Sequence, residues 1–270
     1  MAMRMGIARA LGQFAATWPG EELPAIALER AKMSLSSTLA SAAIGCRIDS
    51  VRAVRLAELD ACGSLLSQAP GLAELWFLGQ RLPAERAARI NAMASDAAAS
   101  DDSDLRSIAH IGTIVSSVGL AVGSVRGCSG SDILSAMVVG YEVAGRVDEA
   151  LTPGRMQRGF HGSVSTVFGS TVACGRLMQL DAEHMAHALA LAASSACGMA
   201  IAADTSCARE YHAGLAAQLG IQAAQAARSP VRCGSAICSS SKSPSAMGAS
   251  SADLSIRPPV IGSQHRAARP

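Results

Sequence analysis

Three aspartates and a histidine stand close together in the segment 99–112, ASDDSDLRSIAHIG. Asp101, Asp102 and Asp104 fall within four positions, and His110 follows them. Carboxylates of this kind can position or deprotonate a substrate, and an imidazole can act as a general acid or base. An acidic loop that caps the next helix has the same composition. The cluster is therefore a candidate catalytic segment, with a solvated loop as the structural alternative.

Two further segments carry side chains that could bind an anion or move a proton. RGFHGS contains His161 between the end of one predicted helix and the start of the next, where an imidazole could meet a bound carboxylate. CAREYHAG spaces Arg209 and His212 three residues apart, so both can face one cavity from a helix. Arginine pairs well with a carboxylate, and histidine carries protons near neutral pH. The structural alternatives are a surface or capping role for His161, and for Arg209 an ion pair with Glu210 or Asp204.

Other possible sites have weaker patterns. EHMAHA contains His184 and His187, but it lacks the spacing of a zinc protease, and its acidic neighbours indicate an exposed first turn. Cys207 and His212 lack a third residue that would orient them as a nucleophile and its base. The sequence shows no glycine-rich nucleotide loop, nucleophile elbow or EF-hand. We therefore predict neither a metal nor an organic cofactor; a metal-dependent hydrolase built on the two histidines is a distant alternative.

The elements that must position these side chains are predicted to be helices. Alanine, the best helix former, is abundant throughout, whereas runs of β-branched and aromatic residues are scarce. This composition predicts an all-α protein with close packing of small residues. The expected helices cover residues 24–44, 52–62, 83–99, 115–125 (buried on all sides), 129–151, 163–178, 181–203 with Asp181 as N-cap, and a last one from about 211.

The final 42 residues differ from the rest of the chain. From Ser229 onward there are eleven serines, five Lys or Arg and a single acid, Asp253. This composition predicts a disordered, low-complexity tail at 229–270 after a helical domain at 1–228. Arginine outnumbers lysine by 21 to 2, which is typical of GC-rich coding DNA. A shifted reading frame in such DNA yields this kind of composition, so a truncated or frameshifted end is a hypothesis.

The overall composition limits the classes of partner. The 270 residues carry a net charge of +2, and this gives no sign of a nucleic-acid surface or of binding to an anionic membrane. Mean hydropathy is +0.27, but glycine, serine or a charge interrupts every apolar run before eighteen residues. The eight cysteines are scattered without a CxxC pair, and no secretory signal precedes them. We therefore expect a soluble cytoplasmic protein with reduced thiols.

Taken together and in this order, the segments resemble the MmgE/PrpD family, which includes 2-methylcitrate dehydratase, cis-aconitate decarboxylase and iminodisuccinate epimerase. The resemblance covers residues 5–228, the N-terminal helical domain of the family. It is carried by SDDSDLRSIAHIG, GCSGSDILSAMVVGYEVAGR, GFHGSVSTVFGS, LDAEHMAHALALAASSACGM and REYHAGLAAQLG.

The first of these segments resembles the family motif D-F-D-D-T/S followed by His-Pro. Asp101, Asp102, Ser103 and His110 match it. Ala99 replaces the first Asp of the motif, Ser100 the Phe, and Ile111 the Pro. In GFHGS the family histidine is His161, with Gly162 in place of the usual Pro, and in the family's Lys-x-x-His the lysine is replaced by Arg209 and the histidine is His212.

The resemblance implies cofactor-free proton transfer at a carbon next to a carboxylate, on a small di- or tricarboxylate, in a homodimer. Arg209 would hold a substrate carboxylate. His110 and His161 would transfer protons or stabilise an oxyanion, with His212 beside Arg209 in the same motif. Asp101, Asp102 and Ser103 would position the substrate.

The resemblance also leaves a second function open. Family enzymes continue into an α+β domain that closes over the site, whereas here the resemblance ends near Arg228. A lyase or isomerase domain, truncated and inactive in this form, is one expectation. The other expectation is a non-catalytic helical module that binds a partner protein or a second copy of itself, because an uncovered domain exposes apolar surface.

Overall fold

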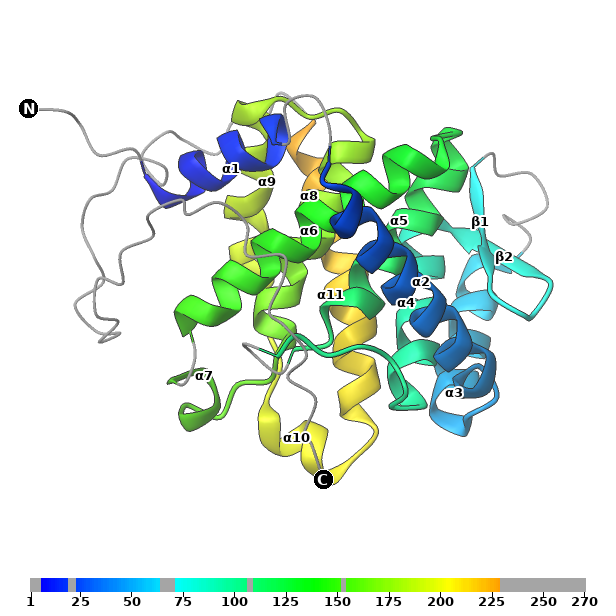
Figure 1. Cartoon of the computed structure of the whole chain (residues 1–270). Coiled ribbons are helices and arrows are strands. Elements are labelled where there is room, and N and C mark those ends of the chain that lie inside the picture. The colour runs from blue at the N-terminus through cyan, green and yellow to red at the C-terminus, as the bar shows by residue number, and fades with distance from the viewer. Residues whose placement is uncertain (1–5, 19–22, 64–70, 106–108, 152–153, 229–270) are drawn as a thin grey trace, which may run out of the picture.

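Helices form most of the part of the chain that the computed structural model describes, which is residues 6–18, 23–63, 71–105, 109–151 and 154–228. This confirms the all-α fold class. The predicted tail at 229–270 lies outside the described residues. In chain order, the helices are α1 (Ile7–Thr17), α2 (Ala25–Gly45), α3 (Asp49–Cys62), α4 (Ala84–Ala97), α5 (Ile111–Arg126), α6 (Gly130–Leu151), α7 (Gly154–Gln157), α8 (Ser163–Leu177), α9 (Ala182–Ser194), α10 (Ala200–Thr205) and α11 (Ala208–Ala227) (Figure 1).

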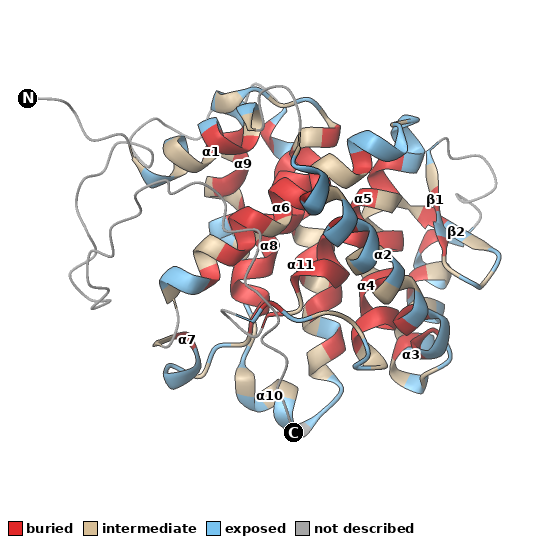
Figure 2. Ribbon diagram, viewed as in Figure 1, coloured by how far each residue is buried: buried red, intermediate tan, exposed pale blue. Residues whose placement is uncertain are grey.

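Three helices, α5, α8 and α11, form the centre of the fold, and the others pack around them. Buried residues are concentrated in these central helices and in the inner faces of α4 and α6 (Figure 2). The helix expected at 115–125 begins earlier, at Ile111, and is buried on nearly all sides as expected. The crossing of α6 and α8 needs glycine, since a Cβ at Gly140 would lie 2.7 Å from the carbonyl oxygen of Gly169. Small residues thus let these helices pack closely.

One small antiparallel hairpin interrupts the helical fold, and the sequence analysis missed it. β1 (Leu72–Leu75) pairs with β2 (Gln80–Pro83) in the register Leu75 to Gln80. Asn91 of α4 holds the hairpin, because its side chain accepts a hydrogen bond from the Trp76 amide at 3.0 Å and donates one to the Glu74 carbonyl at 2.9 Å. Strands of four residues are too short to give a clear alternating pattern.

The single helix predicted over 181–203 is wrong, because the chain forms two helices there, α9 and α10. Between them Gly198 adopts φ +134°, a conformation that residues with a side chain rarely reach. The first helix begins as predicted, with the Asp181 side chain accepting a hydrogen bond from the His184 amide at 2.9 Å. The loop between α9 and α10 contacts the loop that carries His161, so the break helps to position a candidate site residue.

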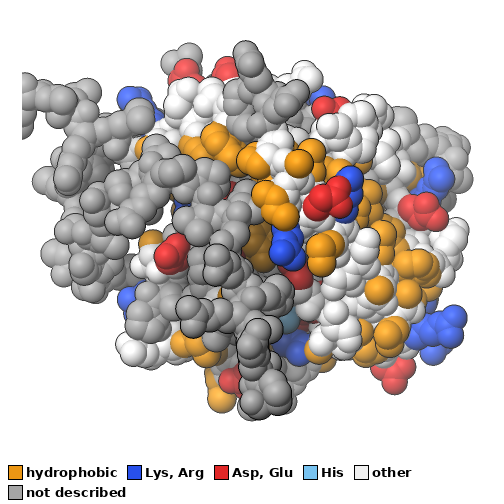
Figure 3. Space-filling view, viewed as in Figure 1, with side chains coloured by type: hydrophobic (Ala, Val, Ile, Leu, Met, Phe, Trp, Pro, Cys, Tyr) orange, Lys and Arg blue, Asp and Glu red, His pale blue; other side chains and the backbone are white. Residues whose placement is uncertain are grey.

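Acidic, basic and apolar side chains are intermixed on the face of the described chain shown in Figure 3. None of the helices in the described ranges combines the length and the apolarity needed to cross a bilayer. The six cysteines in those ranges are free.

Candidate active site

His110 and His161 line the same small cavity, although they lie 51 positions apart in the chain. The cavity lies where the end of α4 and the starts of α5, α8 and α11 meet. Its volume is about 20 Å³, which is room for about one water molecule. Its lining residues are Asp96, Ala109, His110, Ile114, His161, Gly162, Ser163, Thr166 and Ala213.

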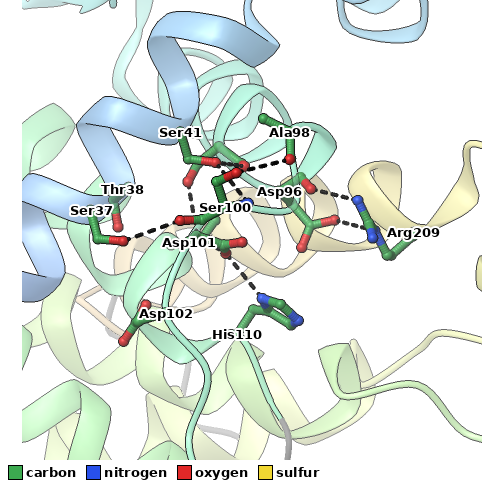
Figure 4. Close-up of polar contacts among 12 residues, drawn as sticks. Ser37, Thr38, Ser41, Asp96, Ala98, Ser100, Asp101, Asp102, His110 and Arg209 are labelled. Atoms are coloured by element: carbon green, nitrogen blue, oxygen red, sulfur yellow. Dashed lines mark hydrogen bonds and ion pairs between the residues drawn. The ribbon is translucent and has the colours of Figure 1, made fainter.

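A buried carboxylate orients His110 at the start of α5. Its Nδ1 lies 3.1 Å from Oδ2 of Asp101, whose side chain is 0% exposed. The Thr113 hydroxyl, one turn into α5, donates a hydrogen bond to the same oxygen. The bond to Asp101 raises the pKa of His110, although burial opposes it. The second ring nitrogen points away from Asp101 (Figure 4).

Asp102 fixes the acidic loop to α2. Its Oδ2 accepts a hydrogen bond from the Ser34 hydroxyl at 3.1 Å, and burial raises its pKa to about 6. The loop can approach α5 because Gly112 has no side chain: a Cβ there would lie 2.0 Å from Oδ1 of Asp102. Asp101 and Asp102 therefore hold the loop in place and do not line the cavity, and Ser103 is exposed. That these three bind substrate remains a prediction.

His161 has the opposite proton preference. Its Nδ1 accepts a hydrogen bond from the Ser163 amide at 3.3 Å, and this contact favours the neutral form with the proton on Nε2. Burial, followed by the positive charges of His212 and Arg155, lowers its pKa to about 4. The amide of His161 donates to the Gly198 carbonyl at 3.0 Å, which ties this loop to the α9–α10 break. His161 is thus a fixed, neutral imidazole at neutral pH.

His212 stands beside His161. The two ring centroids are 5.4 Å apart, and the planes are tilted by 41°. Burial lowers the pKa of His212 as well. One turn earlier on α11 lies Arg209. Both side chains lie close enough to His161 to affect its pKa, but neither is among the residues that line the cavity, so a shared cavity for the two remains a prediction.

Arg209 is held by Asp96, the last acidic residue of α4. Its Nε lies 3.1 Å from Oδ2 of Asp96, and its Nη2 donates to the Asp96 carbonyl at 2.6 Å (Figure 4). The expected partners, Glu210 and Asp204, are not involved in this pair; Glu210 instead accepts a hydrogen bond from Ser50 at 2.6 Å. Asp96 lines the cavity, and Arg209 binds to Asp96 from behind the cavity wall.

A second buried ion pair supports the His161 loop. Nε of Arg155, in α7, lies 3.0 Å from Oδ1 of Asp148 in α6, and both side chains are almost fully buried. Arg155 also donates to the Phe160 carbonyl at 3.4 Å, directly before His161. The Ser165 hydroxyl donates to Asp148 as well. These contacts fix the direction from which the imidazole enters the cavity.

Three residues of the site could in principle hold a metal. Single ligand atoms of Asp96, Asp101 and His110 lie within 4.8 Å of one another. Each carboxylate already has a cationic neighbour, Arg209 for Asp96 and His110 for Asp101. A divalent cation would have to lie beside the guanidinium, where like charges repel. The arrangement therefore fits protons and an anion better than a metal ion.

The weaker candidate His184 lies outside the cavity. It is exposed and lies 2.8 Å from Asp181, its helix-capping neighbour, so it belongs to a solvated first turn. Sequence reasoning missed Asp96 and the pair of Arg155 with Asp148. For Asp96 a signal was present, because a single acid stands among small apolar residues in INAMASDAAAS. For Arg155 there was none, since its partner lies on another helix.

Comparisons with known proteins show what the chain as a whole is similar to. Residues 9–243 match the model of the MmgE/PrpD N-terminal domain. The match thus extends past residue 228, where the sequence analysis placed the end of the domain. Two curated cis-aconitate decarboxylases, one from Aspergillus terreus and one from its strain NIH 2624 / FGSC A1156, are 26% identical to 203 residues of the chain. These 203 residues are 73% of this chain and span 40% of the length of either relative.

Proposed function

Because the chain belongs to the MmgE/PrpD family, we propose that it is the helical domain of a lyase or isomerase acting on a small di- or tricarboxylate. The reaction is a proton transfer that needs neither a metal nor an organic cofactor. One observation carries the proposal: two histidines with opposite proton preferences line one cavity, and a guanidinium lies directly behind the wall. Pairs of titratable groups with diverging pKa values are typical of acid–base sites. The match to proteins named cis-aconitate decarboxylase supports a lyase.

In this proposal His110 carries the proton. Asp101 holds Nδ1 and favours the imidazolium, so the second nitrogen can donate a proton to substrate carbon or oxygen. In a decarboxylation, the electron pair of the broken carbon–carbon bond is taken up by protonation at another carbon as carbon dioxide leaves. In a dehydration or an epimerisation, the neutral ring would first remove a proton from a carbon next to a carboxylate.

His161 and Arg209 stabilise negative charge on the substrate. The neutral His161 offers its Nε2 hydrogen to an oxygen on which charge develops, and it does not compete with His110 for the proton. Arg209 binds a carboxylate of the substrate, a role for which its planar, permanently charged group is suited. His212, whose pKa burial lowers, adds a second neutral ring behind His161.

A second candidate is a binding or dimerisation module without catalysis. The observation that favours it is a set of three exposed apolar side chains: Met156 on α7, Met199 just before α10 and Ile201 on α10. These helices lie at the same end of the molecule as the start of α11 (Figure 1). Exposed apolar groups of this kind are common in protein interfaces. A homodimer formed through them fits either candidate.

Turnover by the purified chain tests the proposal. We expect the protein to convert cis-aconitate or 2-methylcitrate, with and without EDTA, and His110→Asn to lower the rate by about 10²–10⁴-fold. The matched control is His184→Asn, a histidine outside the site, which should retain the rate of the unaltered protein. Equal loss in both variants, or full activity of His110→Asn, contradicts the proposed role. The absence of turnover and of carboxylate binding favours the module.

A further inference from the structure

Asp96 stands between Arg209 and the cavity. Its side chain is 2% exposed and lines the cavity together with His110 and His161. One of its oxygens lies 3.1 Å from Nε of Arg209 (Figure 4). Asp96 lines the cavity and Arg209 does not, so a carboxylate in the cavity meets Asp96 before it meets the guanidinium.

The size of the cavity leads to the same conclusion. A volume of about 20 Å³ accommodates about one water molecule, and a molecule with two or three carboxyl groups is several times larger. Of the contacts that hold the Asp96 side chain, the ion pair with Arg209 is the one that an anionic ligand could replace. Displacing the side chain would enlarge the cavity and expose the guanidinium in one step.

The charges that face Asp96 determine whether it gains a proton when it is displaced. From the segment before α5 come Asp101 and His110, and from α11 come Arg209 and Glu210. The neighbouring helix α2 presents hydroxyls, such as Ser41, which donates to the Ser95 carbonyl at 2.7 Å. Charged residues on the remaining neighbours are engaged elsewhere or exposed: Glu58 of α3 pairs with Arg86 and Arg89 of α4, and Glu74 and Arg81 of the hairpin are exposed.

We propose that Asp96 is a counter-ion that the substrate replaces: a substrate carboxylate takes its place on Arg209, and Asp96 takes up one proton as it loses this partner. The inference rests on the proposed function, because it requires a carboxylate ligand in this cavity. It makes binding selective for anions that can outcompete a buried aspartate. It also places a newly protonated carboxyl next to the reacting groups.

Whether Asp96 takes up or releases a proton on binding follows from the charges around it. Burial and the charge of Asp101 raise the pKa of Asp96 to about 6, while Arg209 lowers it. When a ligand binds Arg209, the guanidinium no longer lowers the pKa of Asp96, and this pKa rises further. The exchange therefore predicts that Asp96, which is ionised at pH 7.5 in the free protein, takes up a proton on binding. Affinity for the anion should fall as the pH rises above about 6, by up to about tenfold per pH unit.

Calorimetric titration of the full chain with cis-aconitate tests the inference. Measured at pH 7.5 in two buffers with different ionisation enthalpies, binding should take up between about half and one proton per site. Asp96→Asn should remove most of this uptake and weaken the dependence of the affinity on pH between 6 and 8, leaving only the contribution of His110. Asp60→Asn, an exposed aspartate on α3, should behave as the unaltered protein. His110→Asn should retain most of the uptake, which separates Asp96 from the other titrating group.

The outcomes separate the inference from the proposed function. Binding without proton uptake, or an unaltered uptake in Asp96→Asn, overturns the exchange and leaves the carboxylate site standing. Failure of cis-aconitate and citrate to bind overturns both. If Asp96→Asn does not fold, the pH dependence of the dissociation constant of the unaltered protein decides, because an affinity that is constant from pH 6 to 8 contradicts the exchange.

Discussion

His110 and His161 face one cavity but hold their protons differently, and their immediate partners explain why. His110 lies next to a fully buried carboxylate, which stabilises its charged form. His161 accepts a hydrogen bond from a backbone amide and has other cationic groups around it. An acid–base site needs one group that can donate a proton and one that stays neutral, and these two environments provide both.

The two titrations can be measured directly. In imidazole ¹⁵N spectra recorded against pH, we expect His110 to titrate above its ordinary value of 6.5 and His161 at about 4. Asp101→Asn should lower the pKa of His110, because it removes the group that stabilises the imidazolium. A common midpoint near 6.5 for both rings would contradict the assigned roles.

At this scale the sequence predicted the residue types better than their contacts. His110, His161, Arg209 and His212 were identified from motifs, and the structure brings all four to one region. The predicted ion-pair partners of Arg209 were wrong. Its observed partner, Asp96, is 113 positions away in the chain and is brought next to it by the packing of α4 on α11. Partners of this kind depend on tertiary structure, which residue spacing does not encode.

At the scale of elements, the interruption between α9 and α10 shapes the site. The chain leaves α9 at Ser194 and turns at Gly198, whose carbonyl accepts the hydrogen bond from His161. Phe160 and Met199 form an isolated antiparallel bridge next to this contact. An uninterrupted helix would remove both contacts, so the break positions the loop that carries the imidazole.

Replacing Gly198 should therefore affect stability and activity together. In Gly198→Ala, the Cβ would lie 2.1 Å from the Ser163 hydroxyl, and φ +134° is strained for alanine. We expect a loss of about 2 kcal/mol in the free energy of unfolding and a reduced rate of turnover. Urea denaturation and steady-state kinetics measure the two effects.

Gly130→Ala provides the matched control, because a Cβ there meets no atom within 4 Å at the start of α6. It should change the free energy of unfolding by less than about 0.5 kcal/mol. Equal stability of the two variants would show that the Gly198 turn is not required.

The break, the hairpin and the helices α1 and α7 are features of the fold that sequence patterns did not reveal. Residues 188–203 are mostly small and apolar, so helical periodicity continues through the position where a single glycine changes the backbone direction. The hairpin strands, with four residues each, are also too short to show a clear alternating pattern in the sequence. By contrast, the long helices were predicted within a few residues of their ends, because alanine-rich segments with capping residues such as Asp181 determine helices locally.

For the whole molecule, the family and the helical fold were predicted from the sequence and are confirmed. The meeting of four distant segments in one cavity could be expected only through the family resemblance, since it depends on how α4, α5, α8 and α11 pack. The chain spans 40% of the length of its curated relatives. The described residues that line the cavity between the two histidines come from α4, α5, α8 and α11 and from the segments just before α5 and α8.

The central claim is that His110, His161 and Arg209 form one site for a carboxylate substrate. A crystal structure of the protein with cis-aconitate tests it most directly. We predict one carboxylate on the Arg209 guanidinium in place of Asp96, with the remainder of the ligand in hydrogen-bond contact with both histidines. A ligand bound elsewhere, with the cavity unchanged, would contradict the claim.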